Sequence, residues 1–253
     1  MSQDLLFSLR LPLPDLVAVA LLFVTWLGIG WLTERPPAGR PSVSVLMVRF
    51  RREWMRQLVA RDNRIFDGNI LASLREGTAF FASACMIATG GLLALIGNGE
   101  RLRGIVQEYE LEAVAGTAWE MRLLVTMFFV VNAFLKFVWA HRLFGYCAIM
   151  MASVPNEPHH PAAEARAMQA ADLNITAARS FNAGLRSVYY ALASLTWLAG
   201  PWALMIGTAV VLFVTWRREF NSTSREVILR SLPAPELSDH ARRPLSERQP
   251  PQP

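Results

Sequence analysis

Long apolar runs dominate the chain. Four of them, Asp15 to Thr33, Thr78 to Gly97, Trp119 to Ala140 and Leu185 to Trp216, are almost uninterrupted by charged residues. A helix needs roughly 20 apolar residues to cross the hydrocarbon core of a bilayer, and each run is about that long or longer. The pattern predicts an all-α, polytopic helical membrane protein.

The fourth run contains Gly200-Pro201 near its middle. Proline lacks a backbone donor, and it pushes the preceding residue off helical geometry. We therefore expect two helices there, joined in a tight hairpin. The predicted spans are then five, at about 15–33, 78–97, 119–140, 181–199 and 201–220.

The arginines predict the orientation of the spans. Of the 24 Arg in the chain, nine lie from Arg35 to Arg75, and seven follow Trp216. Basic residues concentrate on the cytoplasmic side of membrane proteins, so both segments should be cytoplasmic. Five spans satisfy this requirement with the N-terminus outside and the C-terminus inside, whereas four do not.

The rest of the chain divides around these spans. Residues 1–14 form an outer N-terminal segment, 15–220 a single helical membrane domain, and 221–253 a Pro-, Ser- and Arg-rich cytoplasmic tail expected to be largely disordered. Residues 42–75 predict an amphipathic cytoplasmic helix, on which Arg49, Arg52 and Arg56 form a stripe. Such a stripe suits anionic lipid headgroups in the membrane plane, or it only orients the protein and touches the membrane.

Polar residues next to and within the spans are the candidate site. Because burying a charged side chain in the membrane is energetically unfavourable, each of these residues is a candidate for a functional role. Lys136 follows Asn132 by one helical turn and could face a shared interior with Arg186, or its amine could reach up to the lipid interface. The candidate cluster comprises Asp62, Asn63, Arg64, Asp67, Asn132, Lys136, His141, Arg142, Asn182 and Arg186.

The sequence lacks the residue motifs that several kinds of chemistry require. No phosphate-binding loop, nucleophile elbow or HExxH pair occurs. Glu157, His159 and His160 lie in a Pro-rich turn, where they do not converge as metal ligands do, so we predict no metal and no cofactor. Cys85 and Cys147 are expected to be small packing residues. Nucleic acid is not an expected partner, because the membrane orientation explains the net charge of +5.

Four segments together resemble the domain-of-unknown-function 599 family. They are SVSVLMVRFRREWMRQLVARDNRIFDGNIL, FFASACMIATGGLLALIG, FLKFVWAHRLFGYC, and FNAGLRSVYYALASLTWLAGPW followed by WRREF. The similarity extends from about Leu16 to Phe220. It implies a multi-pass membrane protein of the kind found in bacteria and plants, which we expect in a bacterial inner (cytoplasmic) membrane, and it implies no catalytic residue.

These observations predict an oligomeric channel or transport-related protein without enzymatic activity. Its basic cytoplasmic side would face an anionic solute or anionic lipids. Two alternatives stay open. One is an accessory or assembly subunit of a larger membrane complex. The other is a lipid-modifying enzyme with Asp62 or Asp67 as acid or base.

Overall fold

The computed structural model describes residues 12–37, 39–98 and 116–230, and this part of the chain is all-helical. The helices are α2 (Leu13–Glu34), α3 (Val43–Val59), α4 (Ile65–Gly97), α6 (Gly116–Ala152), α7 (Ala163–Leu195), the short 3-10 helix η1 (Thr196–Ala199), α8 (Pro201–Phe220) and α9 (Thr223–Arg230). The all-α class predicted from the sequence is therefore confirmed, while the count of five spans stays a prediction.

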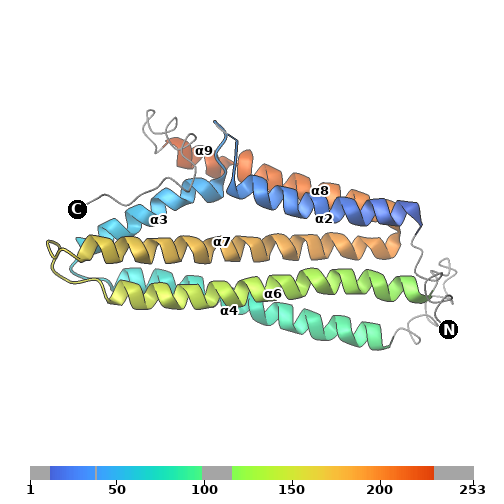
Figure 1. Cartoon of the computed structure of the whole chain (residues 1–253), viewed down its shortest axis with the longest axis horizontal. Coiled ribbons are helices and arrows are strands. Elements are labelled where there is room, and N and C mark those ends of the chain that lie inside the picture. The colour runs from blue at the N-terminus through green and yellow to red at the C-terminus, as the bar shows by residue number, and fades with distance from the viewer. Residues whose placement is uncertain (1–11, 38, 99–115, 231–253) are drawn as a thin grey trace.

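The long helices lie side by side in an elongated bundle (Figure 1). Helix α7 runs through its centre, with α6 packed along one side and the pair α2 and α8 along the other. Helix α4 packs on the far side of α6 and diverges from it toward the end of the bundle that holds the start of α6. Helix α3 lies along the first half of α7.

Among the described residues, three helices are long and apolar enough to cross a membrane: Leu13–Glu34, Ile65–Gly97 and Trp119–Ala152 within α6. Helices α4 and α6 are both longer than one crossing needs, and their polar halves continue beside α3 and the first half of α7. The bundle thus has an apolar half and an arginine-rich half, which we call the membrane half and the cytoplasmic half after the orientation expected from the sequence.

Local sequence explains where several helices begin. Pro12 precedes α2, and the first turns of both α2 and α8 contain proline, whose fixed φ suits a helix start. Ser42 caps α3, because its hydroxyl accepts a hydrogen bond from the Val45 amide at 3.2 Å. The same hydroxyl donates to the Thr33 carbonyl at 2.7 Å, so the turn after α2 is closed at the point where α3 begins.

The predicted turn at Gly200-Pro201 is present. Helix α7 tightens into η1, and Gly200 then adopts φ +110°, a conformation that side chains with a Cβ rarely adopt. Pro201 starts α8, which returns along the bundle. Thr196 helps to hold the turn by donating to the Ala203 carbonyl at 3.0 Å.

The helix predicted over 42–75 is two helices. Helix α3 ends at Val59, residues 60–64 form a corner, and α4 begins at Ile65 and continues without a break into the second apolar run. Asn63 marks the new start, since its side-chain oxygen accepts from the Ile65 amide at 2.9 Å. Of the predicted tail, Thr223–Arg230 form α9, and residues 231–253 lie outside the described residues.

Two apolar cores hold the bundle together. In the membrane half, aromatic rings of α2, α4, α6 and α7 interlock, with the Phe81 and Phe137 rings stacked at 5.3 Å. Gly184 makes this contact possible, because a Cβ at its position would lie 2.7 Å from the Phe137 ring. In the cytoplasmic half, the alanine face of α7 packs against α3 and the end of α6.

Candidate functional site

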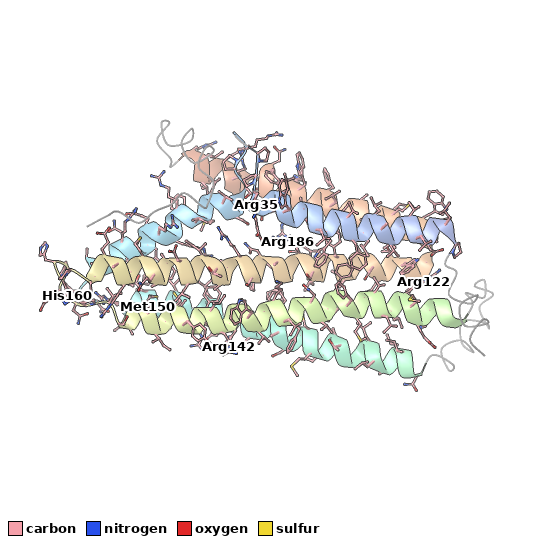
Figure 2. All side chains as sticks on the ribbon, in the orientation of Figure 1. Arg35, Arg122, Arg142, Met150, His160 and Arg186 are labelled. Carbon is pink, nitrogen blue, oxygen red and sulfur yellow. The ribbon has the colours of Figure 1, made fainter. Side chains whose placement is uncertain are left out.

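The polar residues predicted to converge lie at different levels along the bundle. The groups are a corner after α3, a middle level near the start of the second apolar run, and an inner level where α2 ends. Figure 2 shows this spread, with Arg142 and Arg186 on different sides of the bundle. The predicted cluster is therefore divided among separate sets of contacts.

At the corner, Asp67 is fully buried and ion-paired with Arg61. The Trp54 indole also donates to Asp67, at 2.6 Å, which ties α3 to α4. Arg64 donates to two backbone carbonyls at the end of α6, at 2.6 and 2.8 Å. Asp62 is exposed. Asp67 therefore has one structural partner on α3 and one within the corner.

At the middle level, His141 of α6 lies against α4. Its Nδ1 is 3.2 Å from the Thr78 hydroxyl and 3.3 Å from the Arg75 carbonyl. Arg142, one residue on, is exposed and donates to the Tyr146 hydroxyl at 3.0 Å. Lys136 is exposed on the outer face of α6, which fits an amine that reaches the lipid interface.

At the inner level, Arg186 of α7 is only 9% exposed and pairs with Glu34 of α2 at 3.2 Å. The guanidinium also lies beside Gly30, where a Cβ would be in ordinary van der Waals contact with it at 3.6 Å. Because Lys136 is exposed and Arg186 is buried, the two do not share an interior. The prediction that Lys136 and Arg186 face a shared interior does not hold within one chain.

Other polar contacts surround this pair. Asn182 donates to the Ser44 hydroxyl at 3.3 Å, and Ser44 bonds Glu219 through its amide at 3.1 Å and its hydroxyl at 3.0 Å. Asn132 accepts from Ser187 at 3.0 Å across α6 and α7. The inner level thus joins α2, α3, α6, α7 and α8, and three residues of the predicted cluster, Asn132, Asn182 and Arg186, lie within it.

The three arginines predicted to contact lipid headgroups are on α3, which packs lengthwise on α7 rather than across the bundle. Arg52 pairs with Asp172 of α7 at 3.1 Å, and Arg56 lies 3.5 Å from Glu53. Arg49 also makes an interaction within the chain. Their contact with lipid stays a prediction.

Arg51 is the arginine of α3 that turns inward. It donates to the side-chain oxygen of Asn174, whose amide lies 3.8 Å from the Cys147 sulfur. Burial lowers the pKa of the Arg51 guanidinium. The helical pattern could have indicated this residue, because Arg51 shares a helix face with Met55 and Leu58, both fully buried.

A buried charge pair at the other end of the bundle was missed in the sequence. Asp15 accepts a 2.6 Å hydrogen bond from the Trp197 indole and lies 3.5 Å from the Arg122 guanidinium. That guanidinium is also 5.6 Å from the Trp197 ring centre. Asp15 opens the first apolar run, and this position made it look like a simple span boundary.

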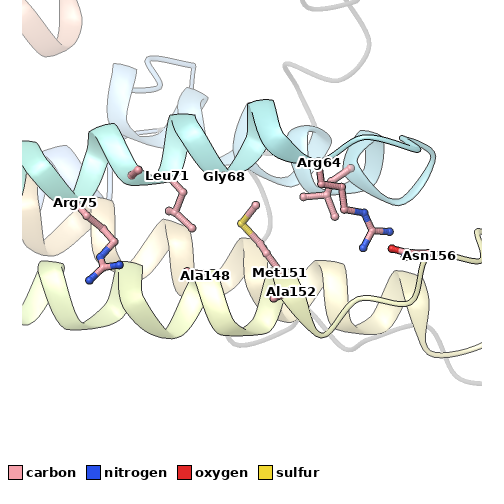
Figure 3. Close-up of a pocket in the computed structure, with 10 residues that line it drawn as sticks. Arg64, Gly68, Leu71, Arg75, Ala148, Met151, Ala152 and Asn156 are labelled. Carbon is pink, nitrogen blue, oxygen red and sulfur yellow. The ribbon is translucent and has the colours of Figure 1, made fainter.

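A cavity of about 330 Å³ lies between α4 and the end of α6, in the cytoplasmic half. Its middle is apolar, with Leu71, Ala148 and Met151 among the lining residues. Figure 3 shows Arg64 and Arg75 at its two ends, with the Arg64 guanidinium directed to Asn156. Arg75 was not among the predicted residues, although its spacing of three helical turns from Arg64 places both on one face.

The sequence profile of a family described as "protein of unknown function, DUF599" matches residues 17–224. The chain belongs to the DUF599 family. No curated protein and no solved structure is significantly similar to it.

The DUF599 match covers most of the described bundle, from the first turns of α2 into α9. It includes the cavity, the corner and the inner level, while Asp15 lies just before it. The family is described as one of unknown function, and its profile assigns no role to any of these residues.

Proposed function

We propose that this DUF599 protein is a transport-related membrane protein without enzymatic activity, and that it works as a homo-oligomer. The observation that carries the proposal is the uncovered membrane half of α4. In the most apolar 18-residue stretch of each helix, 11% of the α4 residues are buried, against 22% in α2 and 39% in α6. Helix α4 contacts chiefly α6, so most of its circumference is free.

The free face of α4 suits close packing against another helix. Ala84, Ala88 and Gly91 are exposed there at spacings of four and three residues. Small residues at this spacing let two membrane helices approach closely. A second copy is the occupant we propose, because symmetric homo-oligomers are the commonest assemblies and need no additional chain.

The buried charges favour a route between copies over one through a single bundle. Asp15 is paired with Arg122, and Glu34 with Arg186, so these charges neutralise each other inside the chain. The excess of arginine in the cytoplasmic half suits an anionic solute or lipid headgroup. Five crossings, with the N-terminus outside and the α7–α8 hairpin as the last two, belong to this proposal.

The test is native mass spectrometry of the protein in lipid nanodiscs. The wild-type protein is expected to be a homo-oligomer, and Gly91→Leu should shift it to monomers. The matched control is Gly28→Leu on the exposed face of α2, because a Cβ at either glycine meets no atom within 4 Å. A monomeric wild-type protein would refute the proposal, and a stoichiometric foreign partner would replace it with the accessory-subunit alternative.

A further inference from the structure

The cavity between α4 and α6 contains a cation without a partner. Arg75 lies one turn before Thr78, where the second apolar run begins, so this end of the cavity is at the boundary of the membrane half. Within the described part of the chain, its guanidinium forms no hydrogen bond or ion pair, and its Nε is buried. A buried donor without a partner is unfavourable, which makes an anion the natural complement.

Arg64 closes the opposite end in a different way. Its two terminal nitrogens are occupied by the Val154 and Pro155 carbonyls, while its Nε is buried without a partner. Arg64 is therefore fixed in place, and Arg75 is the group free to bind. Eleven residues of helix separate the two by roughly 16 Å, so one small anion cannot contact both.

The wall between the arginines defines the rest of the ligand. Leu58, Leu71 and Met151 present apolar surface along the cavity. A guanidinium binds a phosphate group through paired charge-assisted hydrogen bonds, and an apolar wall accepts a hydrocarbon or other organic portion. The cavity thus combines a phosphate-binding end with an apolar channel directed toward Arg64.

We propose that this cavity binds an organic phosphate, with the phosphate group on Arg75 and the organic portion along Leu71 and Met151. The phosphate comes either from a phospholipid headgroup of the adjacent leaflet or from a soluble phosphorylated compound. The site lies within one chain, so binding does not depend on the oligomeric state. If the cavity does not bind a phosphate, the proposed homo-oligomer can still form. If the protein is monomeric, the cavity can still bind a phosphate.

The experiment compares two sources of phosphate in nanodiscs. Retention of phosphatidylglycerol is measured by native mass spectrometry in mixed phosphatidylcholine and phosphatidylglycerol discs. Binding of glycerol phosphate is measured by titration in discs of phosphatidylcholine alone. The variant Arg75→Gln should weaken whichever ligand binds by about tenfold or more, the worth of one charge-assisted hydrogen bond.

Two further variants make the result specific. Arg35→Gln removes the same charge from the exposed end of α2, outside the cavity, and should leave binding unchanged. Ala72→Leu narrows the cavity from an exposed position of α4 and should weaken binding while Arg75 stays in place. Circular dichroism checks that each variant is folded. The proposal is overturned if neither ligand binds, or if a folded Arg75→Gln protein binds as the wild type does.

Discussion

The buried pair at the start of α2 gives the sharpest test of the structure. Asp15→Asn removes the negative charge but keeps a side-chain oxygen that can accept from the Trp197 indole. The substitution therefore tests the effect of leaving the Arg122 guanidinium buried without a negatively charged partner. We expect Asp15→Asn to destabilise the bundle, because desolvating an unpaired guanidinium is unfavourable.

The magnitude follows from burial and distance. Asp15 is 4% exposed and Arg122 is 8% exposed, so water can screen neither charge. Removing one partner of such a pair costs about 3–5 kcal/mol. The separation of 3.5 Å is longer than a charge-assisted hydrogen bond, and Arg122 keeps its contact with the Trp197 ring. The expected loss is therefore near the lower end, about 3 kcal/mol, or roughly a hundredfold in the unfolding equilibrium.

The assay is reversible unfolding in mixed micelles, followed by tryptophan fluorescence and far-ultraviolet circular dichroism. Asp15→Asn, Arg122→Gln and the double variant form a thermodynamic cycle. The double variant should be more stable than the sum of the single losses predicts, because it leaves no unpaired charge. The reasoning is refuted if Asp15→Asn lowers the free energy of unfolding by less than about 1 kcal/mol, or if the two single losses simply add.

Three further changes can be measured by the same unfolding assay. Gly184→Ala should cost about 1–3 kcal/mol, because its Cβ would lie 2.7 Å from the fully buried Phe137 ring; Gly28→Ala is its control, and equal effects would contradict the packing. Ser42→Ala should cost about 1 kcal/mol through loss of the α3 cap, and restoration by Thr but not by Val, which has the same shape without a hydroxyl, would separate capping from side-chain size. Glu34→Gln should cost less than Asp15→Asn, because the Glu34 side chain is 47% exposed and water screens the pair although Arg186 is buried, and an equal loss would show the two ion pairs to be equivalent.

The elements that local chemistry determines could be predicted from the sequence. The turn at Gly200-Pro201 follows from the lack of a proline donor and from a φ that suits glycine. The break between α3 and α4 could not be predicted as securely, because the helical spacing of apolar residues on both sides of Asn63 suggests one continuous helix. The corner depends on a tertiary contact, the closure of Arg61 and Trp54 on Asp67.

The candidate site was harder to predict because periodicity shows which residues share a face but not what covers that face. Lys136 and Asn132 are one turn apart, yet Lys136 is exposed while Asn132 bonds Ser187 of the next helix. The pairing of Asp15 with Arg122 joins residues far apart in the chain, and no local spacing indicates it. Arg75 could have been found only by following the face of Arg64 for three turns.

The contacts also distinguish α4 from the other helices of the membrane half. Ion pairs tie α2 to α6 near its start, through Asp15 and Arg122, and to α7 near its end, through Glu34 and Arg186. Within the described residues, α4 beyond Thr78 makes no hydrogen bond or ion pair to another helix, and apolar packing, chiefly on α6 with a ring contact to Phe181 of α7, holds it. Helix α4 is thus the element whose position is least fixed by polar contacts. Both proposed binding sites, the face for a second copy and the phosphate site at Arg75, lie on this helix.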